Sequence, residues 1–263
     1  MFNKKGMKYI EYNNNDRICY ITLNRPDKKN ALNYDFVSEL KDAFIKASKD
    51  VDCKIIILKA NGDVFSAGAD LAYLEQLQKN TYEENLADSE HLKKLFELIY
   101  KLDKIVIAQV EGHAIAGGCG LATVCDFVFS VPEAKFGYTE VKIGFIPAIV
   151  MFFLIRKIGE SRAKELLLSG QLIHVDKALE IGLANAIFDE KNIERDVKEF
   201  AMQLCNKTSA NSLKLTKQLI AQIQSLNLED ALSLASKANA KARNSDDCKK
   251  GISAFLKKEK FDW

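Results

Sequence analysis

Two short loops of small residues follow apolar segments of the chain and could do chemistry through their backbone amides. The first loop covers residues 65–71 (FSAGADL), and the second covers residues 112–120 (GHAIAGGCG). Small side chains let the backbone approach a ligand closely, and glycines at the start of a helix leave N–H groups without intrahelical partners. One N–H group from each loop would be enough to form an oxyanion hole. Either loop alone is more typical of a plain strand-to-helix turn, but the two together favour a functional site.

Several other kinds of active site do not fit the sequence. Neither loop has the G-K-[ST] of a phosphate-binding loop or the G-x-G-x-x-G spacing of a dinucleotide site. The sequence has neither a serine nucleophile elbow nor an H-E-x-x-H zinc motif. The 3 histidines and 6 cysteines include no C-x-x-C pair and no other spacing that predicts a zinc site. We therefore expect no metal, and we expect free, mostly buried thiols.

The elements that would position these loops alternate between strand-like and helical segments. Alternation and short β-branched runs predict strands at 8–12, 17–23, 54–58, 105–110 and 126–130, with a turn at 13–16 joining the first two. Helical spacing predicts helices at 34–48, 70–78, 83–101, 160–169, 176–181 and 193–205 and over most of 208–259. Strands connected by helices indicate an α/β core with parallel or mixed sheets, followed by a helical tail.

The bulk properties are those of an ordinary globular protein. The chain has 263 residues, 48% of them hydrophobic, and a formal net charge of +2 from 38 basic and 36 acidic side chains. This balance gives no reason to expect nucleic acid or an anionic membrane as a partner. No segment is apolar for long enough to span a bilayer, and residues 1–8 are not followed by the apolar stretch of a secretory signal. We therefore expect a cytoplasmic protein.

Several motifs occur in the order that is typical of one enzyme family. They are the segments 23–33, 65–71, 112–126, 136–144 and 251–258. Together they resemble the crotonase (enoyl-CoA hydratase/isomerase) superfamily over nearly the whole chain. The resemblance implies an α/β fold built as a spiral of ββα units, with a core over 1–195 that carries the CoA-binding and oxyanion-hole loops. It also implies a C-terminal helical region over 196–263 through which the chain forms trimers or dimers of trimers.

The resemblance also implies roles for individual residues. The backbone N–H groups of Ala69 and Gly117 would form the oxyanion hole for a thioester enolate, and Glu140 would be the main acid/base. The substrate would be an acyl-CoA ester, and no cofactor would be needed beyond the CoA that the substrate carries. Losing one oxyanion donor typically costs about 3 kcal/mol, which is a factor of about a hundred or more in rate.

Residues implied to bind the CoA ester lie in the two loops, beside Pro26 and in the C-terminal tail. They are Lys28, Ser66, Ala67, Ala69, Asp70, Leu71, Gly117, Phe255 and Lys258. In relatives the tail positions contact CoA, sometimes from a neighbouring subunit, although amphipathic helix packing would explain Phe255 and Lys258 equally well. Tyr138 and Phe145 are expected to shape the acyl pocket because they lie close to Glu140 in the sequence.

One position departs from the family pattern. Well-studied hydratases of this family use two glutamates, one to deliver water and one to protonate the α-carbon. The second matches Glu140, whereas the first falls on Gly120, which can act neither as an acid nor as a base. Hydration would then depend on Glu140 alone or on another carboxylate, such as Glu84 or Asp88. Isomerisation would need only Glu140 to shuttle a proton between the α and γ carbons, and decarboxylation would rely mainly on the oxyanion hole.

The sequence favours hydration by a small margin. Residues 140–150 look closest to bacterial methylglutaconyl-CoA hydratase-like members, so we predict an enoyl-CoA hydratase, with a methylglutaconyl-type substrate as the finer expectation. The single glutamate fits an isomerase better. A non-catalytic CoA- or RNA-binding member of the fold is suggested by Gly120, but the balanced charge argues against RNA. A purely structural oligomer built on the tail would leave the paired loops unexplained.

Overall fold

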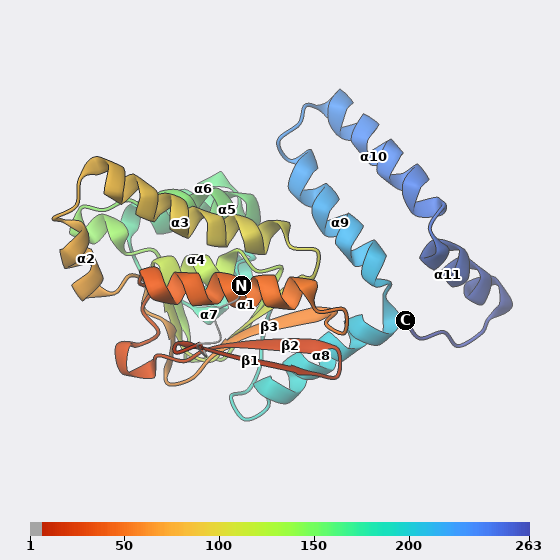
Figure 1. Cartoon of the computed structure of the whole chain (residues 1–263), viewed down its shortest axis with the longest axis horizontal. Coiled ribbons are helices and arrows are strands. Elements are labelled where there is room, and N and C mark those ends of the chain that lie inside the picture. Colours follow the sequence, from red (N-terminus) through yellow and green to blue (C-terminus); the bar gives the residue numbers. More distant parts are fainter. Residues whose placement is uncertain (1–6) are drawn as a thin grey trace.

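The computed structural model describes residues 7–263 and contains two β-sheets surrounded by helices (Figure 1). The larger sheet has six strands in the order β1-β2-β3-β5-β7-β10, and the smaller has four in the order β4-β6-β8-β9. The strands are β1 (Ile10–Asn15), β2 (Ile18–Leu23), β3 (Ile55–Ala60), β4 (Val64–Ser66), β5 (Ile105–Val110), β6 (His113–Ile115), β7 (Phe127–Ser130), β8 (Lys135–Gly137), β9 (Ile173–His174) and β10 (Ala186–Ile187).

From β3 to β8, consecutive strands alternate between the two sheets. Each of β3, β5 and β7 lies in the larger sheet and is followed by a strand of the smaller sheet and then by helical segments. This repetition is the spiral of ββα units that the resemblance implied. The neighbours β2, β3, β5, β7 and β10 pair in parallel, and so do β4, β6 and β8, whereas β1–β2 and β8–β9 are antiparallel.

The helices cover the sheets and then extend beyond them. They are α1 (Tyr34–Lys49), α2 (Leu71–Leu77), α3 (Tyr82–Lys101), α4 (Gly117–Thr123), α5 (Ala148–Ile158), α6 (Glu160–Ser169), α7 (Val175–Glu180), α8 (Ile193–Lys207), α9 (Ala210–Ile223), α10 (Leu228–Arg243) and α11 (Asp246–Lys257), with short 3₁₀ helices η1 (Pro26–Lys28) and η2 (Glu140–Ile143). Parallel strands need cover on both faces, and all six residues of β5 are buried.

The N-terminal hairpin turns later than the sequence indicated. Asn15 of β1 pairs with Ile18 of β2, so Asp16 and Arg17 alone make the turn. Both have positive φ angles, 54° and 67°, as expected for a type I′ turn. The predicted turn at 13–16 was therefore wrong, because the asparagines that resemble turn residues are paired strand residues.

The other predicted elements are confirmed with small shifts at their ends, but some short elements were missed. The helix α5 was not predicted, because its nearly continuous apolar run (AIVMFFLI) does not distinguish a helix from a buried strand. The strands of the smaller sheet were not predicted either, because each has only two or three residues. These short strands carry the candidate site.

The last three helices form an arm that leaves the body of the molecule (Figure 1). Helix α8 spans the boundary predicted at 195/196 and contacts β3, β5 and β7. Helix α9 still contacts β5 and α3, so the arm leaves the body along α9. Large apolar side chains of the arm are exposed, among them Leu228, Leu232, Ile252, Phe255 and Leu256. None of the helices in the described part of the chain has both the length and the apolar character to cross a bilayer.

Candidate active site

The two glycine-containing loops lie side by side at the ends of β4 and β6, which pair in parallel. A Cβ atom built on Gly118 would lie 2.4 Å from the Ser66 carbonyl oxygen, and one built on Gly68 would lie 2.8 Å from the Ala116 Cβ atom. Real Cβ atoms do not approach other atoms so closely. The loops can therefore pack this tightly only because both positions are glycine.

The two predicted oxyanion donors each follow a residue with a positive φ angle. Gly68 has φ +88°, and Ala116 has φ 51° with ψ −126°, which is strained for an alanine. Within residues 7–263, the N–H groups of Ala69 and Gly117 donate no hydrogen bond to another protein group. Two unpaired donors in adjacent loops are the arrangement that an oxyanion hole requires.

Leu32 holds the first loop in place. Its N–H donates to the Gly68 carbonyl (2.7 Å), and its carbonyl accepts the N–H of Asp70 (2.9 Å), which makes a parallel bridge with Ala69. In such a bridge the residue between the two bonded groups turns its own N–H to the opposite side. The bridge therefore leaves the Ala69 N–H free for a ligand. In the sequence, Leu32 stands out only as part of the segment that resembles the family, so this role was not predicted.

Asn30 is a second supporting residue that sequence analysis missed. It is fully buried, and its amide donates to the carbonyls of Asn61 (2.9 Å) and Val64 (2.8 Å). Its carbonyl accepts the hydroxyl of Ser66 (2.8 Å). Buried polar groups need partners, and these bonds satisfy the asparagine while they fix the chain on both sides of β4.

The side chain of Asp70 caps the start of α2 and is not free to bind a ligand. Its carboxylate accepts the Ala72 N–H (2.9 Å) as the helix cap and forms an ion pair of 2.7 Å with Arg25. Burial acts to raise the pKa of this carboxyl, but the hydrogen bond and charge of Arg25 outweigh it together with the backbone N–H bonds, so the pKa is lowered. Arg25 therefore ties the N-terminal segment to the first loop.

The structure brings only part of the predicted CoA-binding set together. Ala67 and the exposed Leu71 flank Ala69, and the exposed Lys28 precedes Lys29, whose carbonyl accepts the Ala67 N–H (3.0 Å). The side chains of Ser66 and Asp70 are occupied by protein partners, so each of these positions could offer a ligand only its backbone.

The tail residues lie elsewhere in this chain. Phe255 is 82% exposed on α11, and Lys258 follows that helix directly. Figure 1 shows the arm at the right of the molecule, whereas α2 and the end of the first loop lie at the left. Within one chain the structure therefore does not bring Phe255 or Lys258 to the predicted site.

Strand β8 carries Glu140 to the second loop. The N–H of Ala116 donates to the Gly137 carbonyl (2.7 Å), and Glu140 begins η2 three residues after that carbonyl. The glutamate is only 9% exposed, and its Oε2 atom is buried without a hydrogen-bond partner among the described residues. A buried carboxylate oxygen without a partner is destabilising, and such groups cluster at functional sites.

The residues around Glu140 form a close-packed support. The hydroxyl of the fully buried Tyr138 hydrogen-bonds that of Thr123 at 2.7 Å, so Tyr138 supports the site from the core instead of lining an open pocket. Burial raises the pKa of the Cys119 thiol to about 12, and the nearby charge of Glu140 adds to this shift. Glu140 thus lies close to the first turn of α4. Phe145 is 56% exposed, so its side chain is accessible to an acyl chain.

Burial also raises the pKa of Glu140 itself, and a hydrogen bond from its own backbone offsets only part of the effect. The folded protein therefore binds this proton more tightly than the unfolded chain does, and stability falls as the pH rises from 4.5 through the raised pKa. We expect Glu140→Gln to be more stable than the wild type at neutral pH, by about 1.4 kcal/mol for each unit of raised pKa. Urea unfolding of both proteins between pH 4 and pH 8 measures the difference, which should shrink toward acid pH. A difference that does not change with pH would contradict this expectation.

The position of the missing first glutamate is filled by other side chains. A Cβ atom built on Gly120 would lie 2.2 Å from Cγ1 of Val150 and 3.3 Å from Cε1 of Phe96. The two carboxylates considered as replacements have structural partners. Glu84 accepts the Thr81 N–H (2.8 Å) in a capping box, and Asp88 accepts the hydroxyl of Tyr73.

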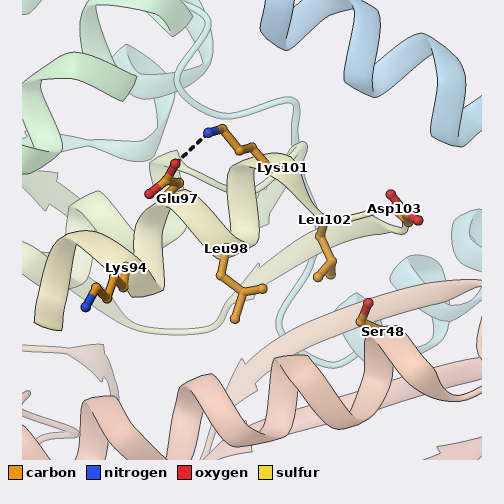
Figure 2. Close-up of a pocket in the computed structure, with 7 residues that line it drawn as sticks. All are labelled: Ser48, Lys94, Glu97, Leu98, Lys101, Leu102 and Asp103. Carbon is orange, nitrogen blue, oxygen red and sulfur yellow. Dashed lines mark hydrogen bonds and ion pairs between the residues drawn. The ribbon is translucent and has the colours of Figure 1, made fainter.

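A surface groove with a volume of about 400 Å³ lies away from this site, between α1 and the second half of α3 (Figure 2). Its lining consists of Ser48, Lys94, Glu97, Leu98, Lys101, Leu102 and Asp103. Lys101 pairs with Glu97 beside it, as the dashed line in Figure 2 indicates. The groove includes none of the predicted site residues, so we do not assign the chemistry to it.

Comparison with known proteins gives a consistent result. The family model described as enoyl-CoA hydratase/isomerase matches residues 13–263. A Thermus thermophilus protein named "Putative enoyl-CoA hydratase" is 40% identical over 92% of this chain and 95% of its own. The crotonyl-CoA hydratase of Syntrophomonas wolfei is 34% identical over 94% of this chain and 95% of its own. A crystal structure of an enoyl-CoA hydratase from Geobacillus kaustophilus superposes with a TM-score of 0.91 at 28% identity and covers 98% of this chain and 97% of its own.

Proposed function

The chain belongs to the enoyl-CoA hydratase/isomerase family, and we propose that it converts an enoyl-CoA ester through the thioester enolate, with Glu140 as its single acid/base. One observation carries the proposal. A buried glutamate with an unpaired oxygen follows the strand that pairs with the second of two adjacent loops, and each loop offers an unpaired N–H group. The proposal needs no cofactor beyond the CoA of the substrate.

The proposed mechanism uses the two loops and the carboxylate together. The thioester oxygen accepts the N–H groups of Ala69 and Gly117, which stabilise the negative charge that develops there as the enolate forms. In hydration, the Glu140 carboxylate takes a proton from water as the oxygen adds to the β-carbon. It then delivers a proton to the α-carbon, so the net change is the addition of one water across the double bond.

Hydration is our first candidate reaction because the Thermus thermophilus and Syntrophomonas wolfei relatives are named as hydratases. The resemblance of residues 140–150 extends this proposal to a methylglutaconyl-type ester. Isomerisation is the second candidate, because Val150 fills the space beside Gly120. The proposed site therefore has one carboxylate, that of Glu140, and isomerisation needs only one. In that reaction Glu140 removes a proton from the α-carbon of a β,γ-enoyl-CoA, which gives the enolate, and returns it to the γ-carbon, so the double bond becomes conjugated with the thioester.

An absorbance assay separates these candidates. Purified protein would be incubated with crotonyl-CoA, methylglutaconyl-CoA and a β,γ-enoyl-CoA while the absorbance of the conjugated thioester is followed. Hydration removes the conjugated double bond, so the absorbance falls with the first two substrates. Isomerisation of the third substrate creates the conjugated bond, so the absorbance rises. If no CoA ester bound or turned over, the proposal would fail.

We also propose that the arm of α9–α11 is covered by neighbouring copies of the chain in a trimer or a dimer of trimers. Leu256 and Phe255 are 74% and 82% exposed, which is unfavourable for large apolar side chains unless a partner covers them. Such an assembly would bring Phe255 and Lys258 to the CoA site of a neighbouring subunit, which this chain's own arm does not reach.

A charge on the arm tests this assembly. We expect Leu256→Asp to shift the protein to monomers, because a carboxylate is costly to bury in an apolar interface. Val51→Asp is the matched control, since Val51 is also an exposed apolar residue (94%) but lies in the body between α1 and β3. Light scattering coupled to size-exclusion chromatography measures the mass. A wild-type monomer, or an equal effect of both variants, would contradict the proposal.

A further inference from the structure

We propose that Val150 determines which chemistry the site performs, because its side chain fills the space into which a side chain at position 120 would project. This inference rests on the proposed function. It adds to that function a specificity-determining residue on α5, a helix that carries none of the acid/base or oxyanion groups. It also explains why position 120 is glycine.

The packing between α4 and α5 leaves no room at position 120. A Cβ atom on Gly120 would lie 2.2 Å from Cγ1 and 2.8 Å from Cβ of Val150, and 3.3 Å from Cε1 of Phe96. Val150 is 4% exposed and Phe96 is fully buried, so neither side chain can move into solvent without disrupting the core. Gly117 on the same helix differs, since a Cβ atom there would meet only Leu32, at an ordinary 3.4 Å.

Position 120 is on the same face of α4 as Gly117. Residues three apart on a helix are neighbours on one face, and each Cα–Cβ bond leans toward the helix N-terminus. A side chain at position 120 would therefore lean over the first turn, where the N–H of Gly117 is unpaired. Glu140 begins η2 three residues after Gly137, whose carbonyl accepts the N–H of Ala116 directly before this turn (2.7 Å). A carboxylate at position 120 would consequently face the same ligand as Glu140.

The consequence is that Val150 on α5 occupies the space that a second acid/base side chain on α4 would need. With valine at position 150, the site presents methyl groups where a carboxylate could otherwise hold a water molecule. With glycine at position 150, the same space could accept a glutamate from α4. The number of acid/base groups would thus depend on positions 120 and 150 together, and neither substitution alone would change it.

The experiment compares Gly120→Glu, Val150→Gly and the double variant, with Gly120→Gln/Val150→Gly as the matched control. We expect Gly120→Glu alone to lower the melting temperature by about 5 °C or more, because overpacking a core is destabilising. The double variant should recover most of this loss. It should also hydrate crotonyl-CoA at least about tenfold faster than Val150→Gly, because a positioned acid/base typically contributes this much or more. The glutamine control should show no gain.

Three outcomes would overturn the inference. The first is a Gly120→Glu variant as stable as the wild type, and the second is a double variant that hydrates no faster than its glutamine control. If the double variant does not fold, Gly120→Ala and Val150→Gly with their double variant test the packing, because only glycine at position 150 removes both nearby Val150 atoms. Melting temperatures that simply add in that cycle are the third outcome.

The test separates this inference from the proposed function. Wild-type turnover that requires Glu140 would support the function even if positions 120 and 150 proved independent. Absence of any wild-type turnover would count against the function, whereas non-additive melting temperatures at positions 120 and 150 would still demonstrate the packing that the inference needs.

Discussion

Replacing Glu140 with glutamine is expected to lower kcat by about a thousandfold, while the affinity for the CoA ester changes little. Glutamine keeps the size of the side chain but can neither accept nor deliver the proton at the α-carbon. No carboxylate at position 120 can take over, because that position is glycine and its space is filled by Val150. The oxyanion donors belong to the backbone and remain in place. The loss should therefore appear in kcat and in kcat/KM alike.

The control for this result is Glu133→Gln, because Glu133 is an exposed carboxylate in the turn between β7 and β8. That variant should retain wild-type turnover. Glu140→Asp should recover part of the activity, since it restores a carboxyl group with a shorter reach. Calorimetric titration with the CoA ester measures binding separately from turnover. Retained turnover in Glu140→Gln would remove this residue from its proposed role, and lost binding would point to a structural role instead.

The pH dependence of catalysis should also reflect the raised pKa of Glu140. Burial raises the pKa of Glu140, so the carboxylate form that accepts a proton becomes populated only above the usual range of a glutamate. The acid limb of the kcat/KM profile should therefore lie above pH 4.5, the ordinary value for this side chain. The limb and the stability difference described above would report the same ionisation by two independent measurements.

The sequence was informative where local chemistry decides the structure. Small residues after apolar runs predicted the two loops, whereas the acid/base role of Glu140 was implied only by the family resemblance of the motif around it. These features depend on short segments, so they can be read without knowing the fold. The long helices were predicted for the same reason, because their apolar spacing is set by residues on one helix face.

The sequence was uninformative where distant segments meet. Nothing local indicates that Leu32 bridges to Ala69, or that Ser66 is occupied by the carbonyl of Asn30. Gly120 could be recognised as a missing glutamate, but the reason for the glycine lies on α5, thirty residues later at Val150. These contacts join elements that only the complete fold places together.

The position of the tail illustrates the same limit. An amphipathic pattern predicted helices near the C-terminus, and the structure has them. The pattern does not state what covers their apolar faces, and Phe255 remains exposed in the isolated chain. A residue that acts in a neighbouring subunit has the sequence signature of an ordinary packing residue. The proposed role of Phe255 therefore rests on its exposure and on the positions of the arm and α2 at opposite sides of the molecule (Figure 1).

The second large effect is expected for Gly68→Ala, which should reduce kcat/KM by about a hundredfold, the usual loss when one oxyanion donor is misplaced. A Cβ atom on Gly68 would lie 2.8 Å from Cβ of Ala116, 3.1 Å from the carbonyl of Ile115 and 3.4 Å from the N atom of Gly117. The added methyl group would separate the two loops at the point where their donors must meet. Steady-state kinetics with the best CoA ester measures the loss.

Gly62→Ala provides a closely matched control, because an alanine would be strained to a similar degree at both positions, but only Gly68 lies against the second loop. Gly62 has φ +86° against +88° for Gly68, and its added Cβ would also lie 2.8 Å from a side-chain carbon, that of Pro26. Both variants should therefore lose similar stability from backbone strain. Only Gly68→Ala alters the spacing of the two N–H donors, so only that variant should lose most of its activity. Equal losses in both variants would attribute the effect to strain and would argue against convergence of the donors on one oxygen.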